Sequence, residues 1–285
     1  MNVTLIGVGL ISGSFALGLK KTYEGSLHVC GMDKDELALQ KAKALGIIHS
    51  IKPLKEAVAE ADVVAIGIPV DVLVNLLPEI LDACKEDALV IDFGSTKNAI
   101  CAAVTDHSKR ANFVAAHPIA GTEYSGPEAA FPSLFEQKVM IVCEEEKSGE
   151  KQLDLFKELC QMLDMRLTSM NPAEHDLHLA FVSHLSHVTS FALSQAVMQK
   201  EKSEQRIFDM AGSGFASTVR LAKSSPEMWS PIFLQNREHL LEGLTTYIDQ
   251  LEQFKTLLEN GDAQGMKAYM KEANKIREIV DRLKG

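Results

Sequence analysis

The chain has 285 residues, of which 46% are hydrophobic and 24% are charged, a composition typical of globular proteins. Its 29 Lys and Arg residues against 39 Asp and Glu residues give a net charge of −10. This charge disfavours binding to nucleic acid or to an anionic membrane through the bulk field. The length is sufficient for two domains of ordinary size.

The cysteines are five in number, an odd count, and no two of them form a Cys-x-x-Cys pair. This spacing argues against a disulfide framework and against a thiolate zinc site. No apolar run approaches the roughly 20 residues that a membrane-spanning helix needs, and the start of the chain lacks the regions of a signal peptide. We therefore expect a protein of the reducing cytoplasm. The cysteines are Cys30, Cys84, Cys101, Cys143 and Cys160.

Short β-rich runs alternate with helical patterns through about residue 170. The runs "DVVAIGIP" and "ALVIDFG" are almost continuously apolar, which is typical of parallel strands covered on both faces. The pattern predicts an α/β fold with an N-terminal Rossmann-type, doubly wound, mainly parallel sheet. The expected strands are Val3–Ile6, Leu27–Met32, Val63–Ile68, Leu89–Phe93, Phe113–Ala116, Val139–Cys143 and Arg166–Ser169, and the helices between them include Lys34–Leu45, Val72–Cys84 and Lys151–Leu163.

The pattern changes after "SMNPAEHD". Asn171 is placed to cap a helix, with Pro172 in its first turn and Glu174 three residues after the cap. Beyond this point we expect no strand but long helices, one ending at Gly261 and a last one over about Ala263–Leu283. The predicted boundary lies near residue 170, with the sheet domain over 1–170 and an all-α C-terminal domain over 171–285.

The stretch "VTLIGVGLISGSFALGLKK" resembles a dinucleotide-binding fingerprint with one substitution. Gly7 and Gly9 occupy the first two glycine positions, Ser12 occupies the third, and Gly13 comes one place late. The first glycine makes the tight turn, the second lets the backbone approach the pyrophosphate, and the third lets the helix pack closely on the sheet. Ser12 therefore affects packing against strand Val3–Ile6 more than cofactor contact, although a plain glycine-rich turn would look similar.

Three further strand ends carry residues suited to a cofactor. Asp33 follows "LHVCGM", where a carboxylate would bind the ribose hydroxyls of NAD and repel the 2′-phosphate of NADP. A helix-capping or solvated aspartate is the alternative. Pro69 lies in "IPVD" and Ser95 in "DFGSTK", at the strand ends where a doubly wound sheet places ligand contacts.

The next strand ends in "AAHPIAGTEYSG", and here the sequence resembles the prephenate and arogenate dehydrogenase family. The similarity continues through "EHDLHLAFVSHLSH" to "GSGFASTVRLAKSSPEMW" and covers nearly the whole chain. It implies an oxidative decarboxylation that makes 4-hydroxyphenylpyruvate from prephenate, or tyrosine from arogenate, in tyrosine biosynthesis. It also implies NAD or NADP as cofactor, of which Asp33 favours NAD, and a homodimer formed through the helical, substrate-binding domain. We expect neither a chorismate mutase before Met1 nor a regulatory domain after Gly285.

The resemblance assigns His117 as the group that accepts the substrate hydroxyl proton, since a neutral imidazole accepts a proton near pH 7. Ser95 would lie between this histidine and the nicotinamide, with a helix N-cap as its alternative role. Arg220 would anchor the ring carboxylate through two parallel hydrogen bonds. The cofactor would contact Gly7, Gly9, Leu10, Ile11, Asp33, Pro69 and Ser95.

The helix after Pro172 carries His184 and His187 on the same face as Asp176, because the spacings are of three and four residues. No His-Glu-x-x-His arrangement or thiolate accompanies these histidines, so we expect no metal; packed core histidines are the alternative. By resemblance His187 reaches the substrate side chain. The other predicted substrate-site residues are His175, His184, Trp229, and Thr122 and Glu123, which would gate the site through an ionic contact.

Prephenate is favoured over arogenate because no carboxylate stands beside His187 on the outer turn, although Asp176 on that face could favour an ammonium group. A β-hydroxyacid-type dehydrogenase would need a lysine on the first long helix after the boundary, and Asn171–Met198 contains none. A redox-sensing protein that binds dinucleotide without turnover would need neither His117 nor Arg220.

Overall fold

The computed structural model describes residues 1–282. The chain forms one compact unit over Met1–Arg237 and a second that begins at Glu238. The boundary predicted near residue 170 lies inside the first unit, between its last strand and the helices that follow. Every candidate site residue belongs to this first unit.

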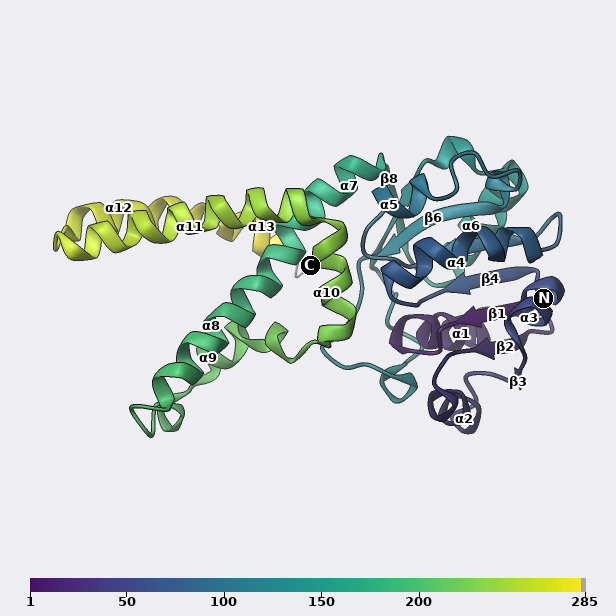
Figure 1. Ribbon diagram of the computed structural model, residues 1–285, viewed down its shortest axis with the longest axis horizontal. Helices are drawn as coiled ribbons and strands as arrows, with labels where there is room; N and C mark the ends of the chain where they lie inside the picture. Colours follow the sequence, from purple (N-terminus) through teal and green to yellow (C-terminus); the bar gives the residue numbers. More distant parts are fainter. Residues whose placement is uncertain (283–285) are drawn as a thin grey trace. The chain divides into compact units, whose positions relative to one another are not determined.

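One eight-stranded sheet runs through the first unit, in the order β3-β2-β1-β4-β5-β6-β7-β8 (Figure 1). All neighbouring strands are parallel except β6 and β7. The predicted mainly parallel, doubly wound sheet is therefore confirmed. Its strands are β1 (Asn2–Ile6), β2 (His28–Met32), β3 (Ser50–Ile51), β4 (Val63–Ile66), β5 (Leu89–Asp92), β6 (Phe113–Pro118), β7 (Val139–Cys143) and β8 (Arg166–Met170).

Strand β3 was not predicted from the sequence, because two residues are too few to show the alternation or the apolar run of a strand. The chain order reverses between β1 and β4, since β1 pairs with β2 on one side and with β4 on the other. Ligands of doubly wound sheets bind at such a switch point, outside the carboxyl ends of the strands.

Helices cover both faces of the sheet, and its strands are therefore buried on both sides. On one face α1 (Leu10–Thr22), α2 (Glu36–Ala44) and α6 (Glu150–Met162) contribute Phe15, Leu39 and Phe156 to a common core. On the other face α3 (Leu54–Glu60), α4 (Val70–Ala83) and α5 (Asn98–Ala102) pack through side chains such as Val58, Leu73 and Ile100. The predicted catalytic residues lie at strand ends of this sheet, with His117 near the end of β6 and Ser95 in the loop that follows β5.

The helical part of the first unit begins at α7 (Pro172–Leu179), and the Asn171 side chain accepts a hydrogen bond from the Glu174 amide, 2.8 Å away. The predicted helix start is thus confirmed. A π-helical turn, Ala180–His184, joins α7 to α8 (Leu185–Glu201), followed by α9 (Ser213–Thr218) and α10 (Pro226–Gln235). Trp229 and Ile232 of α10 belong to the same core as α4, so these helices pack directly on the sheet domain.

The second unit is a helical hairpin. Helix α11 (Arg237–Glu259) ends before Gly261, and α12 (Ala263–Ala273) begins with the Asp262 side chain accepting a hydrogen bond from the Gly265 amide. Phe254 and Tyr269 join the two helices, with ring centroids 5.5 Å apart. The last described helix is α13 (Arg277–Arg282). The predicted final helix is thus interrupted at Asn274–Ile276, and its end at Leu283 lies outside the described residues. Among residues 1–282 no helix is long and apolar enough to cross a membrane.

Candidate active site

The loop between β1 and α1 has room for a phosphate group. Gly7 has a φ of +85°, and a Cβ there would lie 2.5 Å from the Gly67 carbonyl oxygen, so this turn requires glycine. Gly9 is the N-cap of α1, no side chain caps the helix, and nothing lies within 4 Å of where its Cβ would stand. Free amide groups and open space at a helix N-terminus fit the pyrophosphate of a dinucleotide.

Ser12 packs against the end of β4. Its hydroxyl is buried and has no hydrogen-bond partner, and a Cβ at position 67 would overlap it. Gly67 therefore accommodates the Ser12 side chain. Gly13 serves another contact, because a Cβ there would lie 2.8 Å from the Ala130 Cβ. The expected packing against Val3–Ile6 alone is thus incomplete, since the loop after β4 provides the closest neighbour.

Asp33 lies directly after β2 and is tied to the glycine loop. Its Oδ2 accepts a hydrogen bond from the Val8 amide at 3.0 Å, and its Oδ1 accepts one from the Asp35 amide at 3.0 Å. Helix α2 is capped by Asp35, so the alternative of Asp33 as the helix cap is wrong. A carboxylate offers about four acceptor positions, which leaves capacity for ribose hydroxyls. Of the other predicted cofactor contacts, Leu10 is buried, whereas Ile11 and Pro69 are half-buried.

His117 lies on β6 and is 8% exposed. Its Nδ1 lies 2.8 Å from Nε2 of His175 on α7, and Nδ1 of His175 lies 2.8 Å from Oδ1 of Asp176. Asp176 also accepts hydrogen bonds from the amides of Lys97, at 2.7 Å, and Asn98, at 2.9 Å. The structure thus joins the sheet, the start of α5 and helix α7 through one buried polar network.

A buried ion pair supports the loop that carries Ser95. The Lys97 ammonium donates to Asp92 Oδ2, and both side chains are fully buried. Asp92 also accepts hydrogen bonds from the Gly94 amide at 2.8 Å and from the Ala116 amide at 3.1 Å. Ser95 is half-buried, and it does not cap α5, because the N-cap of that helix is Lys97. Ser95 as a helix cap is therefore wrong.

Sequence reasoning missed Asp92 and Lys97, and it considered Asp176 only as a possible contact of the substrate. A signal was present, because an aspartate inside the apolar run "ALVIDFG" must find buried partners. The partner could not be chosen from the sequence, since the chain contains many lysines.

Burial keeps the site histidines neutral near pH 7. Burial, and then the nearby His175, Lys97 and His184, hold the pKa of the His117 imidazole well below its usual range. Burial also lowers the pKa of His175 despite its bond to Asp176, and lowers that of His184 to about 4. For Asp176, burial alone would raise the pKa, but the hydrogen bonds from His175, Asn98 and Lys97 outweigh it and lower the pKa of the carboxyl.

His184 and His187 both contact Trp229. The ring of His187 stacks on the indole with centroids 3.4 Å apart, and His184 meets it edge-on at 5.9 Å. The Asn236 side-chain amide lies 3.1 Å from His184 Nδ1. The π-helical turn just before α8 ends at His184, and such turns often mark functional sites. Within residues 1–282, no group of three or more His, Cys, Asp or Glu side chains is placed to hold a metal ion.

Arg220 and Glu123 form an ion pair, with Nη1 and Oε2 3.3 Å apart. The arginine side chain is 49% exposed and the glutamate side chain 16% exposed. A hydrogen bond from its own backbone amide, assisted by the Arg220 guanidinium, lowers the pKa of the Glu123 carboxyl. The Thr122 hydroxyl accepts a hydrogen bond from the Tyr124 amide at 3.2 Å. The sequence prediction of an ionic contact at Glu123 named no partner, and in the structure that partner is Arg220.

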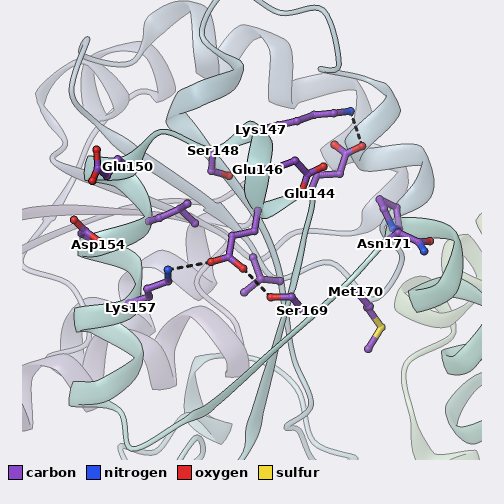
Figure 2. A pocket seen from close by; sticks show the side chains of 14 residues that line it. Glu144, Glu146, Lys147, Ser148, Glu150, Asp154, Lys157, Ser169, Met170 and Asn171 are labelled. Atoms are coloured by element: carbon purple, nitrogen blue, oxygen red, sulfur yellow. Dashed lines mark hydrogen bonds and ion pairs between the residues drawn. The ribbon is translucent and has the colours of Figure 1, made fainter.

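A hollow of about 910 Å³ lies between β7, α6 and the end of β8 (Figure 2). Half of the residues that line it are charged, and in Figure 2 Lys147 points toward Glu144. Lys157 and Ser169 both bind the Glu145 carboxylate. None of the predicted site residues lines this hollow, and its two lysines pair with Glu144 and Glu145.

Comparison with known proteins gives consistent matches along the chain. The family model "Prephenate dehydrogenase, nucleotide-binding domain" matches residues 15–169, and "Prephenate dehydrogenase, dimerization domain" matches residues 171–272. Prephenate dehydrogenase of Bacillus subtilis is 31% identical over 97% of this chain and 75% of its own length. Cyclohexadienyl dehydrogenase of Zymomonas mobilis is 30% identical over 97% of this chain and 94% of its own length.

A solved structure matches with a TM-score of 0.85 and 31% identity over 98% of both chains. It is the prephenate dehydrogenase of Aquifex aeolicus in complex with hydroxyphenyl propionate and NAD⁺.

Proposed function

The chain belongs to the prephenate dehydrogenase family, and from this premise we propose that it converts prephenate to 4-hydroxyphenylpyruvate and carbon dioxide, with NAD as oxidant, in tyrosine biosynthesis. Residues 1–170 would form the NAD-binding domain, and residues 171–285 the helical domain that binds substrate and forms a homodimer. The match of residues 171–272 to a dimerization domain supports the second assignment. The single observation that carries the proposal is the meeting of His117 with His175 of the helical segment.

When bound, NAD would supply the acceptor for the hydride of the substrate's hydroxyl-bearing carbon. The uncapped start of α1, the open space beside Gly9 and the carboxylate of Asp33 would hold it. Asp33 favours NAD over NADP because a 2′-phosphate would be repelled by its negative charge. Leu10, Ile11, Pro69 and Ser95 would complete the contacts.

His117 would take the proton of the substrate hydroxyl as the neighbouring carbon is oxidised. Its low pKa supports this role, because a neutral imidazole has a lone pair available at physiological pH. Ser95, on a loop supported by the buried Asp92–Lys97 pair, would orient the hydroxyl toward this imidazole. The low pKa also means that the imidazolium formed must be stabilised by its neighbours.

Arg220 would bind the ring carboxylate of the substrate. Its partial exposure and its long contact with Glu123 leave the guanidinium free to change partners. Because the carboxylate leaves as neutral carbon dioxide, strong stabilisation of its charge would favour the ground state over the transition state. Arg220 would therefore position the substrate more than it accelerates the reaction.

We favour prephenate over arogenate as the substrate. The two substrates differ in the side chain, where arogenate carries an ammonium group in place of a keto group. Asp176, the carboxylate that could have favoured the ammonium group, already accepts hydrogen bonds from Lys97, Asn98 and His175 and is 3% exposed. His187 and Trp229 remain as neutral neighbours for the keto acid side chain, with His184 and Thr122 close to them in the predicted site.

The test is to mix the purified protein with prephenate and NAD, then with arogenate and NAD, and to follow the absorbance of the reduced nicotinamide. We expect turnover with prephenate and at least tenfold lower kcat/KM with arogenate. His117→Asn should lower kcat by about 10² to 10⁴-fold, the usual contribution of a general base, and largely spare KM. No turnover with either substrate and either nicotinamide cofactor would refute the proposed activity.

A further inference from the structure

The polar network behind His117 determines where that imidazole carries its proton. Asp176 is the starting point, because an ionised carboxylate can only accept hydrogen bonds. Its oxygens accept from the amides of Lys97 and Asn98, which are donors by necessity. The contact between Asp176 Oδ1 and His175 Nδ1, at 2.8 Å, therefore places a hydrogen on Nδ1 of His175.

The same reasoning carries on to the next ring. A neutral imidazole has one N–H group, so His175 with its hydrogen on Nδ1 presents a lone pair at Nε2. That Nε2 atom lies 2.8 Å from Nδ1 of His117, which must then be the donor. Neutral His117 consequently carries its hydrogen on Nδ1 and presents a lone pair at Nε2.

We propose that His175 and Asp176 are positioning residues that hold His117 as the Nδ1–H tautomer and so keep its Nε2 ready to receive a proton. The inference rests on the proposed function in one respect, namely that His117 is the base. It adds that the direction of the hydrogen bonds is set by the amides at the start of α5.

Burial protects this arrangement from competing partners. His175 is fully buried and Asp176 is 3% exposed, so water does not replace either bond. The other charged or titratable groups around the pair are Lys97, Asp92 and His184. The Lys97 ammonium has only donors, the Asp92 carboxylate already accepts from Lys97, Gly94 and Ala116, and His184 Nδ1 contacts Asn236.

The arrangement also stabilises the product of proton transfer. When His117 gains a proton at Nε2, its Nδ1–H continues to donate to His175, whose Nε2 is made more basic by the bond to Asp176. An Asp–His pair that holds a catalytic histidine in one tautomer is known from serine proteases, where replacing the aspartate by asparagine lowers kcat about 10⁴-fold. Here a second histidine stands between the carboxylate and the base.

The direct test is the protonation pattern of the His117 ring, measured by two-bond ¹H–¹⁵N correlation spectra of the full-length protein labelled at histidine. The His117→Asn variant identifies the signals of this ring. We expect the Nδ1–H form in the wild-type protein near neutral pH. In Asp176→Leu, the acceptor of the His175 Nδ1–H group is lost, so both rings can invert and His117 should shift toward the Nε2–H form.

Kinetics then separate positioning from a general loss of structure. Asp176→Leu, which removes the acceptor of the His175 Nδ1–H group, should lower kcat by about 10² to 10⁴-fold, with KM changed less than threefold. His175→Gln should retain kcat within about tenfold, because the amide oxygen can accept the His117 Nδ1–H, whereas His175→Leu should match Asp176→Leu. Asp87→Asn is the control, since Asp87 is exposed and pairs only with Lys151 at the surface.

Two outcomes would overturn the proposal: an Nε2–H form of His117 in the wild-type protein, or equal kcat values for His175→Gln and His175→Leu. The His175 variants also decide the matter if Asp176→Leu does not fold. The spectra need no substrate, so a failure of the proposed reaction and a failure of this inference are distinguishable.

Discussion

Ser12 and Gly67 should be energetically coupled, although neither residue would touch substrate. A methyl group added at position 67 would overlap the Ser12 hydroxyl but would lie at an ordinary 3.5 Å from the Ser12 Cβ. Gly67→Ala should therefore clash when residue 12 is serine and fit when residue 12 is alanine. The backbone at Gly67 is not in the left-handed region, so alanine is otherwise compatible with this position.

The magnitudes follow from burial. Overpacking by one methyl group costs about 1–3 kcal/mol, and this is the expected effect of Gly67→Ala alone. Ser12→Ala alone should stabilise by about 1 kcal/mol, because it removes a buried hydroxyl without a partner and favours the helix. In the double variant the clash is absent, and Gly→Ala adds about 0.4–1 kcal/mol by restricting the unfolded chain. The coupling should thus be about 1–3 kcal/mol.

The assay is urea unfolding of the wild-type protein, the two single variants and the double variant, with NAD affinity measured by titration. Ser12→Ala should leave the Kd for NAD within threefold, because Ser12 faces Gly67 and not the open space beside Gly9. Effects that add to within about 0.5 kcal/mol would refute the predicted packing. A large change in NAD affinity with unchanged stability would show that the third fingerprint position contacts the cofactor in this protein.

Three other predictions concern the site. Arg220→Gln should raise the KM for prephenate at least tenfold and change kcat only a few-fold, with the exposed Lys200→Gln as control; an unchanged KM would exclude the anchoring role. Asp33→Ser should reduce the preference for NAD over NADP by about tenfold, and an equal ratio in both proteins would show that Asp33 does not bind the ribose. The free energy of unfolding should fall as the pH falls from about 6.5 to 4, because unfolded histidines bind protons in that range while His184, with a pKa of about 4, does not. His184 alone would contribute about 3 kcal/mol over this range, so His184→Gln should flatten the measured slope, and an unaltered slope would contradict the low pKa.

The sequence by itself determined the elements whose signals are local. The apolar runs of β4 and β5 identify strands buried on both faces, and Asn171 marks a helix start because capping involves only residues within one turn. The motifs "HPIAG" and "TVRLAKSSPEMW" were sufficient to indicate the family. The roles assigned to the individual site residues stay predictions, which the experiments above address.

Only the tertiary structure decided which buried polar groups meet. His117 and His175 are 58 residues apart, and Lys97 and Asp176 are 79 apart, so no spacing rule relates them. Asp176 and His184 were expected on one helical face and are both buried, in contact with the same Asn236 side chain, but the π-helical turn between them and the contact of His184 with Trp229 could not be read from the sequence. The Ser12 side chain packs against Gly67, which directly follows strand β4, the neighbour of β1 at the switch point of the sheet. Local patterns specify helices and strands because the side-chain periodicity that buries one or both of their faces lies within a few residues of sequence, whereas the partners of a buried charge depend on how distant segments pack.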